Sequence, residues 1–243
     1  MKITLIHGQQ HKGSTYHIAR QVAESLGEAQ AVYEFFLPAG GPDFCVGCYR
    51  CFYEGEQHCP HAAKVQPIVA AMKESDVIIL SSPSYCLEMS GQMKSLFDHL
   101  AYMWMVHRPN QRMFGKVGVT VSTASGAGAA HVTKALAKQL FWLGVPAVLR
   151  IHKSVYATDW PSVSQKVKDQ LAKRSREVAR RAARKAGRSK PGLRQRAVFL
   201  AMRQMHKANG WNPTDKNHWE AKGWLGKARP WQAAAHGDAV LKH

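Results

Sequence analysis

The chain has 243 residues, 45% of them hydrophobic, and a formal net charge of +18. This length can bury one large core with an appendage, and no apolar run reaches the roughly 18 residues that a membrane span needs. The first residues turn polar too soon for a secretory signal, so we expect a cytoplasmic protein. Four of the five cysteines cluster, which in a reducing compartment indicates metal or redox chemistry rather than disulfides.

The positive charge is concentrated in the last third of the chain. Residues 151–243 hold about 21 lysines and arginines against about 6 acidic residues, whereas residues 1–150 are nearly balanced. This shift is the clearest boundary in the sequence. It predicts a first domain over 1–151 and a basic C-terminal extension over 152–243.

The first part alternates strand and helix patterns. Apolar strands are expected at 3–7, 31–37, 76–82, 116–122 and 145–151, with helices at 14–26, 65–75, 91–105 and 130–143. Ser14-Thr15 offers N-cap chemistry for the first of these helices. Continuous Val/Ile/Leu strands separated by helices predict a parallel sheet covered on both faces. Five such units fit a doubly wound, flavodoxin-like α/β fold with strand order 2-1-3-4-5.

The extension has a different pattern. Long helices are predicted over 162–186 and 193–208, and the final stretch has no period but is rich in tryptophan. Rings of this size are rarely left in water, so we expect the extension to pack on the first domain or on a second subunit. The tryptophans concerned are Trp211, Trp219, Trp224 and Trp231.

Three loops are expected at the carboxyl edge of the sheet, where open parallel sheets bind ligands. Loop 8–15 offers glycines, hydroxyls and helix N–H groups suited to phosphate, but it lacks a Walker ending. Loop 82–85 sets a rigid proline beside an aromatic ring, and the glycine-rich loop 122–128 permits close backbone approach. Each loop alone also fits an ordinary turn. Together they favour a site for flavin mononucleotide (FMN).

Four cysteines occur within fifteen residues, in the pattern Cys45-x2-Cys48-x2-Cys51-x7-Cys59. Thiolates select iron–sulfur clusters or zinc. Zinc sites usually split into two separated pairs, whereas three thiols within seven residues fit a single cluster better. An iron–sulfur cluster on these four cysteines is therefore favoured, and zinc or metal-free thiols remain alternatives. The fifth, Cys86, is predicted to be a buried, inert thiol.

The order of these features resembles the flavodoxin-like NAD(P)H-dependent FMN oxidoreductases, and within them the iron–sulfur flavoproteins. The likeness covers residues 1–150, with weaker matches around Asn212-Pro213-x-Asp215 and Trp219-x4-Trp224. The matching segments are Ile6-His7-Gly8, Lys12-Gly13-Ser14-Thr15, the four-cysteine motif, Ser82-Pro83-Ser84-Tyr85, residues 89–94, Phe97-Asp98 and loop 122–128.

The resemblance implies a non-covalent FMN, with its phosphate in loop 8–15 and its ring between the other two loops. It also implies a [4Fe–4S] cluster near the flavin. The chain departs from the family at Gln9-Gln10-His11, where Ser-Pro-Arg is common, so a weaker charge faces the phosphate. The expected cofactor-binding residues are Gln9, His11, Gly13, Ser14, Thr15, Pro83, Ser84, Tyr85, Thr123, Ala124, Gly126 and Gly128.

The predicted function is an FMN-dependent oxidoreductase that moves electrons from NAD(P)H or an acidic, ferredoxin-type donor to a small-molecule or quinone acceptor. Without a cluster, the alternative is an NAD(P)H-dependent FMN or quinone reductase. A lower-ranked alternative is a basic partner- or nucleic-acid-binding protein with a zinc-stapled loop. The missing aromatic interleaving disfavours nucleic acid. The family likeness implies a homo-oligomer, a dimer or a tetramer.

Overall fold

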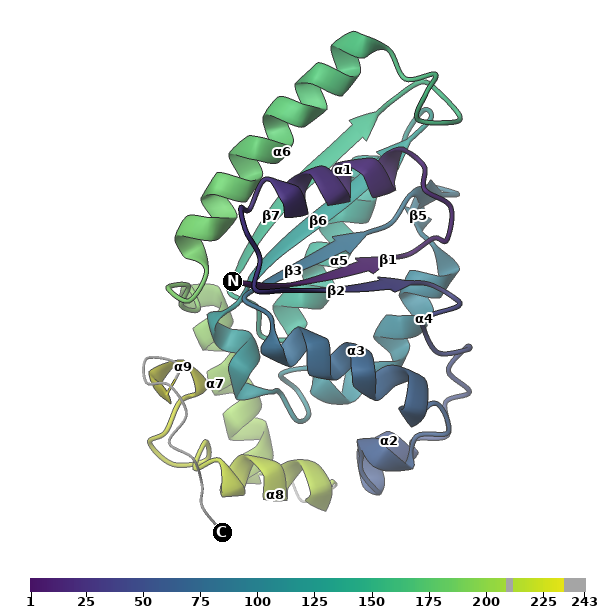
Figure 1. Cartoon of the computed structure of the whole chain (residues 1–243). Coiled ribbons are helices and arrows are strands. Elements are labelled where there is room, and N and C mark those ends of the chain that lie inside the picture. Colours follow the sequence, from purple (N-terminus) through teal and green to yellow (C-terminus); the bar gives the residue numbers. More distant parts are fainter. Residues whose placement is uncertain (209–211, 234–243) are drawn as a thin grey trace.

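The computed structural model describes residues 1–208 and 212–233. Its main sheet has five parallel strands in the order β2-β1-β3-β6-β7 (Figure 1). The predicted flavodoxin-like order is thus confirmed. Because every pairing is parallel, the carboxyl ends of all five strands meet at one edge. The strands are β1 (Lys2–His7), β2 (Ala31–Phe36), β3 (Val77–Ser81), β6 (Val117–Ala124) and β7 (Ala147–Ser154).

Helices cover both faces of the sheet. One face carries α1 (Ser14–Glu24) and α6 (Gln165–Lys185), and the other carries α3 (Ala62–Glu74), α4 (Gly91–His99) and α5 (Ala129–Trp142). This division arises because successive side chains of a strand point to opposite faces of the sheet. On β3, Val77 and Ile79 belong to the first core, and Ile78 and Leu80 belong to the second. Hydrophobic residues on both sides of one strand require a helical layer on each face.

Helix α6 belongs to the sandwich around the sheet, although the sequence analysis grouped it with the extension. Its buried side chains Leu171, Val178 and Ala182 share a core with Ile18 and Val22 of α1. The basic residues of α6 are mostly exposed on its outer side. The division of the chain at residue 151 remains a prediction.

A short hairpin at the carboxyl edge was not predicted. It pairs β4 (Ser84–Tyr85) with β5 (Glu88–Met89) through a two-residue turn at Cys86 and Leu87. Both turn residues have positive φ, 49° and 68°, a conformation that hairpins usually reach with Asn-Gly. This sequence therefore carried no turn signal. The prediction of a buried Cys86 is wrong, because the turn exposes its side chain.

Other bounds shift by a few residues. The helix predicted over 91–105 ends at His99, and a separate 3-10 turn, Ala101–Met103, follows it. The cysteine-rich segment contains α2 (Arg50–Tyr53) and a 3-10 turn, Glu56–His58, and a further 3-10 segment, Gln111–Gly115, precedes β6. No helix in residues 1–208 and 212–233 is long and apolar enough to cross a membrane.

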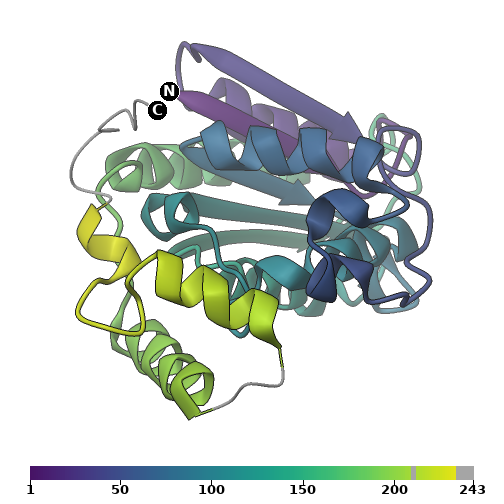
Figure 2. The ribbon, with the colours of Figure 1, turned by 90° about the horizontal axis from the view of Figure 1, so that it is seen from below.

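The end of the described chain forms a small helical layer below the sheet (Figure 2). It comprises α7 (Leu193–Ala208), α8 (Pro213–Ala221) and α9 (Pro230–Ala233). Trp219, Trp224 and Phe199 are buried together against Met105 and Phe114, which precede β6. Trp231 packs at the margin of this cluster, and Trp211 lies outside the described residues. The extension thus has an aromatic core of its own that includes two residues from the first part.

Candidate functional site

The three predicted flavin loops follow β1, β3 and β6, the three central strands of the sheet. Hydrogen bonds join these loops directly. The hydroxyls of Thr15 and Thr123 lie 2.6 Å apart, which connects the first loop to the third. The backbone N–H of Gly8 donates to Ser81 O at 2.7 Å, and that of Ser82 donates to Val121 O at 3.0 Å. These bonds fix the positions of the three loops relative to one another at the carboxyl edge.

The first loop presents the N-terminus of α1 at this edge. Gly13, in an extended conformation, is the N-cap and supplies no side-chain cap, so the prediction of Ser14-Thr15 as caps is wrong. Ser14 and Thr15 instead form the buried first turn, since the Thr15 hydroxyl bonds across to Thr123. Gln9 is 3% exposed, and neither of its amide atoms has a hydrogen-bond partner. An unsatisfied buried amide is a polar group suited to a ligand.

The second and third loops approach each other closely. A Cβ at Gly128, whose φ is +95°, would lie 2.2 Å from Ser84 Oγ, so the approach requires glycine. At Gly126 a Cβ would meet nothing within 4 Å. The Ser84 hydroxyl is itself buried and unpartnered, while the ring of Tyr85 is 44% exposed. This edge therefore offers an exposed aromatic ring next to an unsatisfied hydroxyl.

The remaining predicted flavin residues divide between the interior and the surface. Pro83, Thr123 and Ala124 are buried where their strands end, whereas His11 is exposed. The twelve residues thus lie in the loops that follow the three central strands, at the ends of those strands, in the first turn of α1 or in β4. His11 lies beside Gly13, where a Cβ would be 3.0 Å from the histidine ring.

A buried histidine lies directly under this edge. His7, at the end of β1, is fully buried, with Nδ1 2.7 Å from Ser81 Oγ and Nε2 2.9 Å from Glu34 Oε1. Burial lowers the pKa of His7, and the hydrogen bond to Glu34 opposes this effect. In the neutral ring Nε2–H donates to the carboxylate and Nδ1 accepts from the Ser81 hydroxyl. These bonds join β1 to both neighbouring strands.

The cysteine loop, residues 44–61, leaves the same edge after β2 and runs to the α3 side of the sheet. Cys45 and Cys48 are exposed, Cys51 and Cys59 are half-buried, and all four are free thiols. Burial, reinforced by the charges of the neighbouring cysteines, raises the pKa of Cys51 to about 11. No three His, Cys, Asp or Glu side chains among the described residues are arranged to hold a metal ion. The four predicted ligands share a loop but do not form a closed ligand set.

Cys59 has a histidine partner. Its Sγ lies 3.6 Å from Nδ1 of the buried His99, and His99 Nε2 donates to Asp43 O at 2.9 Å. Because a carbonyl can only accept, the proton of the neutral ring is on Nε2 and Nδ1 faces the thiol as an acceptor. This contact connects the end of the loop to α4.

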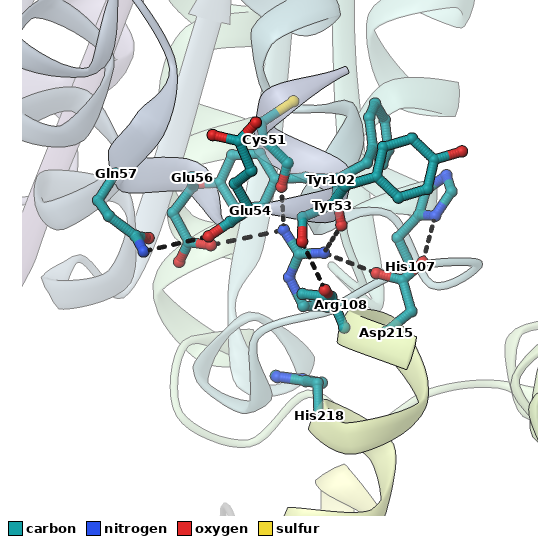
Figure 3. Close-up of polar contacts among 12 residues, drawn as sticks. Cys51, Tyr53, Glu54, Glu56, Gln57, Tyr102, His107, Arg108, Asp215 and His218 are labelled. Atoms are coloured by element: carbon teal, nitrogen blue, oxygen red, sulfur yellow. Dashed lines mark hydrogen bonds and ion pairs between the residues drawn. The ribbon is translucent and has the colours of Figure 1, made fainter. Parts of the chain in front are cut away.

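The middle of the loop is bonded by an arginine from outside it (Figure 3). Arg108, only 8% exposed, donates through Nη2 to Cys51 O and through Nη1 to Phe52 O at 3.1 Å. Nη1 also lies 2.7 Å from Oδ1 of the fully buried Asp215, and Asp215 Oδ2 lies 2.8 Å from His107 Nδ1. Nothing in the sequence predicted Arg108, and Asp215 was indicated only by the Asn212-Pro213-x-Asp215 pattern, which assigned it no role.

Comparison with known proteins points to flavin enzymes. The family model described as NADPH-dependent FMN reductase matches residues 1–157. An iron–sulfur flavoprotein of Methanocaldococcus jannaschii is 32% identical over 128 residues, 52% of this chain and 65% of that protein. An iron–sulfur flavoprotein of Archaeoglobus fulgidus is 33% identical over 86 residues, 35% of this chain and 36% of that protein. The chain thus spans less than two thirds of the length of either curated relative.

A solved structure supports the same fold. An FMN-dependent NADH-azoreductase from Bacillus anthracis, in complex with FMN, superposes with a TM-score of 0.55. The superposition covers 75% of this chain and 100% of that chain, at 13% sequence identity. An identity this low supports a shared fold alone.

Proposed function

Because the chain belongs to the NADPH-dependent FMN reductase family, we propose that it is an FMN-dependent oxidoreductase with its flavin at the carboxyl edge of the sheet. The observation that carries the proposal is the buried, unpartnered amide of Gln9 beside the first turn of α1. Leaving such a group unsatisfied costs about 1–3 kcal/mol, which a polar ligand would recover. The unpartnered Ser84 hydroxyl supports the same location.

The residues of this edge fit the parts of FMN. Backbone N–H groups at the start of α1 suit the phosphate, together with the hydroxyls of Ser14 and Thr15. Gly128 leaves room for a flat ring to approach the backbone, and the exposed ring of Tyr85 can pack on it. When bound, the flavin supplies hydride acceptance and stepwise electron release. NAD(P)H is the proposed reductant and a quinone or another small molecule the proposed acceptor.

We extend the proposal to a [4Fe–4S] cluster on Cys45, Cys48, Cys51 and Cys59. The donor set fits chemically, because four thiols on one loop are the usual ligands of such a cluster. The two curated relatives carry the name iron–sulfur flavoprotein. Binding would require the exposed part of the loop to close.

Anaerobic purification tests both cofactors. Flavin absorbance with a broad iron–sulfur shoulder, and matching iron and sulfide contents, would support the full proposal. Flavin without iron would leave the cluster-free NAD(P)H-dependent reductase as the function. A colourless protein with stoichiometric zinc would overturn the flavin assignment.

The phosphate loop is tested by a double variant. Ser14→Ala with Thr15→Ala is expected to weaken FMN binding in a fluorescence titration of the apoprotein. Thr214→Ala is the matched control, because this hydroxyl lies on α8 and bonds Tyr53 O, outside the carboxyl edge. Unchanged affinity in the double variant would mean that the loop does not hold the phosphate.

A one-electron protein donor is proposed to approach at the cysteine loop rather than at the basic helix. Helix α6 packs on α1, on the face of the sheet opposite to α3, whereas α2 lies on the α3 side (Figure 1). The cysteine loop exposes Phe44, Val46 and Tyr49, which suit contact with another protein. A homo-oligomer, dimer or tetramer, also remains a proposal, and light scattering of the purified protein tests it.

A further inference from the structure

We propose that helix α8 positions the cysteine loop through the ion pair of Arg108 and Asp215, hereafter the Arg108–Asp215 clamp, which fixes the backbone of Cys51. Arg108 and Asp215 are positioning residues in this scheme. The role of the clamp at a metal centre rests on the proposed cluster. The effect of the clamp on the position of the cysteine loop is independent of the cluster, because its contacts are present in the protein as described.

Arg108 gathers acceptors from separate parts of the chain (Figure 3). Its guanidinium bonds the carbonyl oxygens of Cys51 and Phe52 in α2 and the carboxylate of Asp215 in α8. Glu56 Oε2 lies 3.5 Å from Nη2. The flat, forked guanidinium can reach several acceptors at once, which a lysine ammonium on its flexible stem cannot reproduce.

Asp215 is held as firmly as its partner. It is fully buried, and its two oxygens are taken by Arg108 and by His107. Its backbone N–H donates to the side-chain oxygen of Asn212, the N-cap of α8, at 3.3 Å. A buried charge is stable only while its partners remain in place. The pair therefore fixes the start of α8 against α2.

Two further bonds make the contact continuous. Thr214 Oγ1 donates to Tyr53 O at 2.8 Å, and Asn212 Nδ2 lies 3.5 Å from Phe52 O. The carbonyl oxygens of three successive residues, 51 to 53, thus bond to groups outside the cysteine loop. Helix α2 has four residues, none of them buried. So short a helix has little stability of its own, and the external bonds decide its position.

The clamp acts on a predicted ligand. Cys51 is the third of the four cysteines, and the bond from Arg108 to its carbonyl fixes the peptide from which its thiol projects. A ligand held in this way needs less reorganisation when a metal centre forms, and partners beyond the ligands commonly affect metal affinity by tenfold or more. The extension would thereby determine how well the loop holds its centre.

The first test uses the metal-free protein. Asp215→Asn and Arg108→Gln are each expected to raise amide hydrogen exchange over residues 49–55, and alkylation of Cys51, by at least about tenfold. Glu220→Gln is the matched control on α8, since Glu220 makes a surface pair with Lys216 at 3.9 Å. Unchanged exchange and alkylation in both clamp variants would overturn the clamp.

The second test uses protein reconstituted with iron and sulfide. The clamp variants are expected to release iron to a chelator severalfold faster than the wild type and to show an altered electron paramagnetic resonance line shape. Arg108→Lys, which keeps the charge but not the fork, should fold normally and still show the altered line shape. Identical release and spectra in all variants would overturn the positioning of Cys51. A wild type that binds no iron would overturn the proposed cluster, and hydrogen exchange would then decide the clamp alone.

Discussion

The carboxyl edge and the cysteine loop are adjacent, but they are built in different ways. The edge consists of the ends of the fully buried strands β3 and β6 and of β1, which is buried after Lys2, and bonds such as Thr15–Thr123 join its loops. The cysteine loop has two exposed cysteines and a four-residue helix with no buried side chain. Its order comes from Arg108 and Asp215, which lie far away in the sequence.

This contrast shows two ways to position a ligand site. Packing of the sheet places the edge loops, so their geometry follows from folding of the core. The cysteine loop receives no such placement, and its stability depends on polar contacts with a separate helical layer. Weakening that layer should therefore affect the loop and leave the edge intact.

The largest expected effect comes from Trp219→Ala. Trp219 is fully buried, stacks on Phe199 at 4.7 Å and donates to His107 O at 2.6 Å. We expect a loss of about 3–5 kcal/mol in the free energy of unfolding of the extension, measured by urea titration. Hydrogen exchange in the cysteine loop should rise, while the FMN affinity stays unchanged. Leu200→Ala, at an exposed position of α7, is the control, and a parallel loss of FMN binding would mean that the two regions are not separable.

The second effect concerns the edge. Gly128→Ala would place a methyl group 2.2 Å from Ser84 Oγ at a φ of +95°. We expect about 1–3 kcal/mol of strain and roughly tenfold weaker FMN binding, measured by fluorescence titration. Gly126→Ala is the matched control, with no atom within 4 Å of the new methyl. Equal affinities for the two variants would show that the close approach at Gly128 is not used by the ligand.

The third effect is a dependence of stability on pH. Burial lowers the pKa of His7 under the edge and that of His206 in the extension. Because each pKa is lower in the folded protein, the unfolded chain takes up these protons first as the pH falls below the ordinary pKa of about 6.5. The free energy of unfolding should thus fall as the pH falls from 7 toward the folded-state pKa, by up to about 1.4 kcal/mol per pH unit for each group.

Urea titrations across this pH range measure the slope. His206→Gln should flatten it in the extension, and His7→Gln should flatten it in the sheet. A slope that neither variant changes would contradict the assignment of these two histidines. Comparison of the two variants also shows whether the sheet or the extension loses stability first as the pH falls.

The smallest effect concerns one hydrogen bond. Thr15→Val removes the contact with Thr123 and should lower the free energy of unfolding by about 1 kcal/mol. A double-mutant cycle with Thr123→Val isolates the coupling between the two hydroxyls. Hydrogen exchange in the cysteine loop should not change. A coupling energy near zero would show that the first and third loops are positioned by the strands alone.

The sheet could be predicted from the sequence because its signals are local. The apolar runs at 3–7 and 76–82 are strands, and their order follows from general rules of parallel sheets. The hairpin at 84–89 could not be predicted, since its turn residues Cys86 and Leu87 rarely adopt positive φ. The prediction of Ser14-Thr15 as N-cap residues is wrong, and the Thr15 hydroxyl instead takes part in a tertiary hydrogen bond with the Thr123 hydroxyl.

The candidate site also has one part that local sequence signals predict and one part that tertiary contacts determine. The edge loops were predictable because each directly follows a strand. The partners of the cysteine loop were not, because Arg108 lies outside every predicted element and is separated from Asp215 by 107 positions. The signal for α8 was present, since Asn212 followed by Pro213 is a typical helix start. This helix-start pattern does not indicate which surface α8 packs against.

The bond between Cys51 and Arg108 also has a consequence for the order of events during synthesis. The residues of the carboxyl edge have all been made once Gly128 leaves the ribosome, well before those of α8. Asp215 is made much later, and until then Arg108 lacks its buried counter-charge. During that interval residues 51–53 lack the bonds that Asp215 and Thr214 supply or support. The arrival of α8 completes these bonds and fixes the position of the segment.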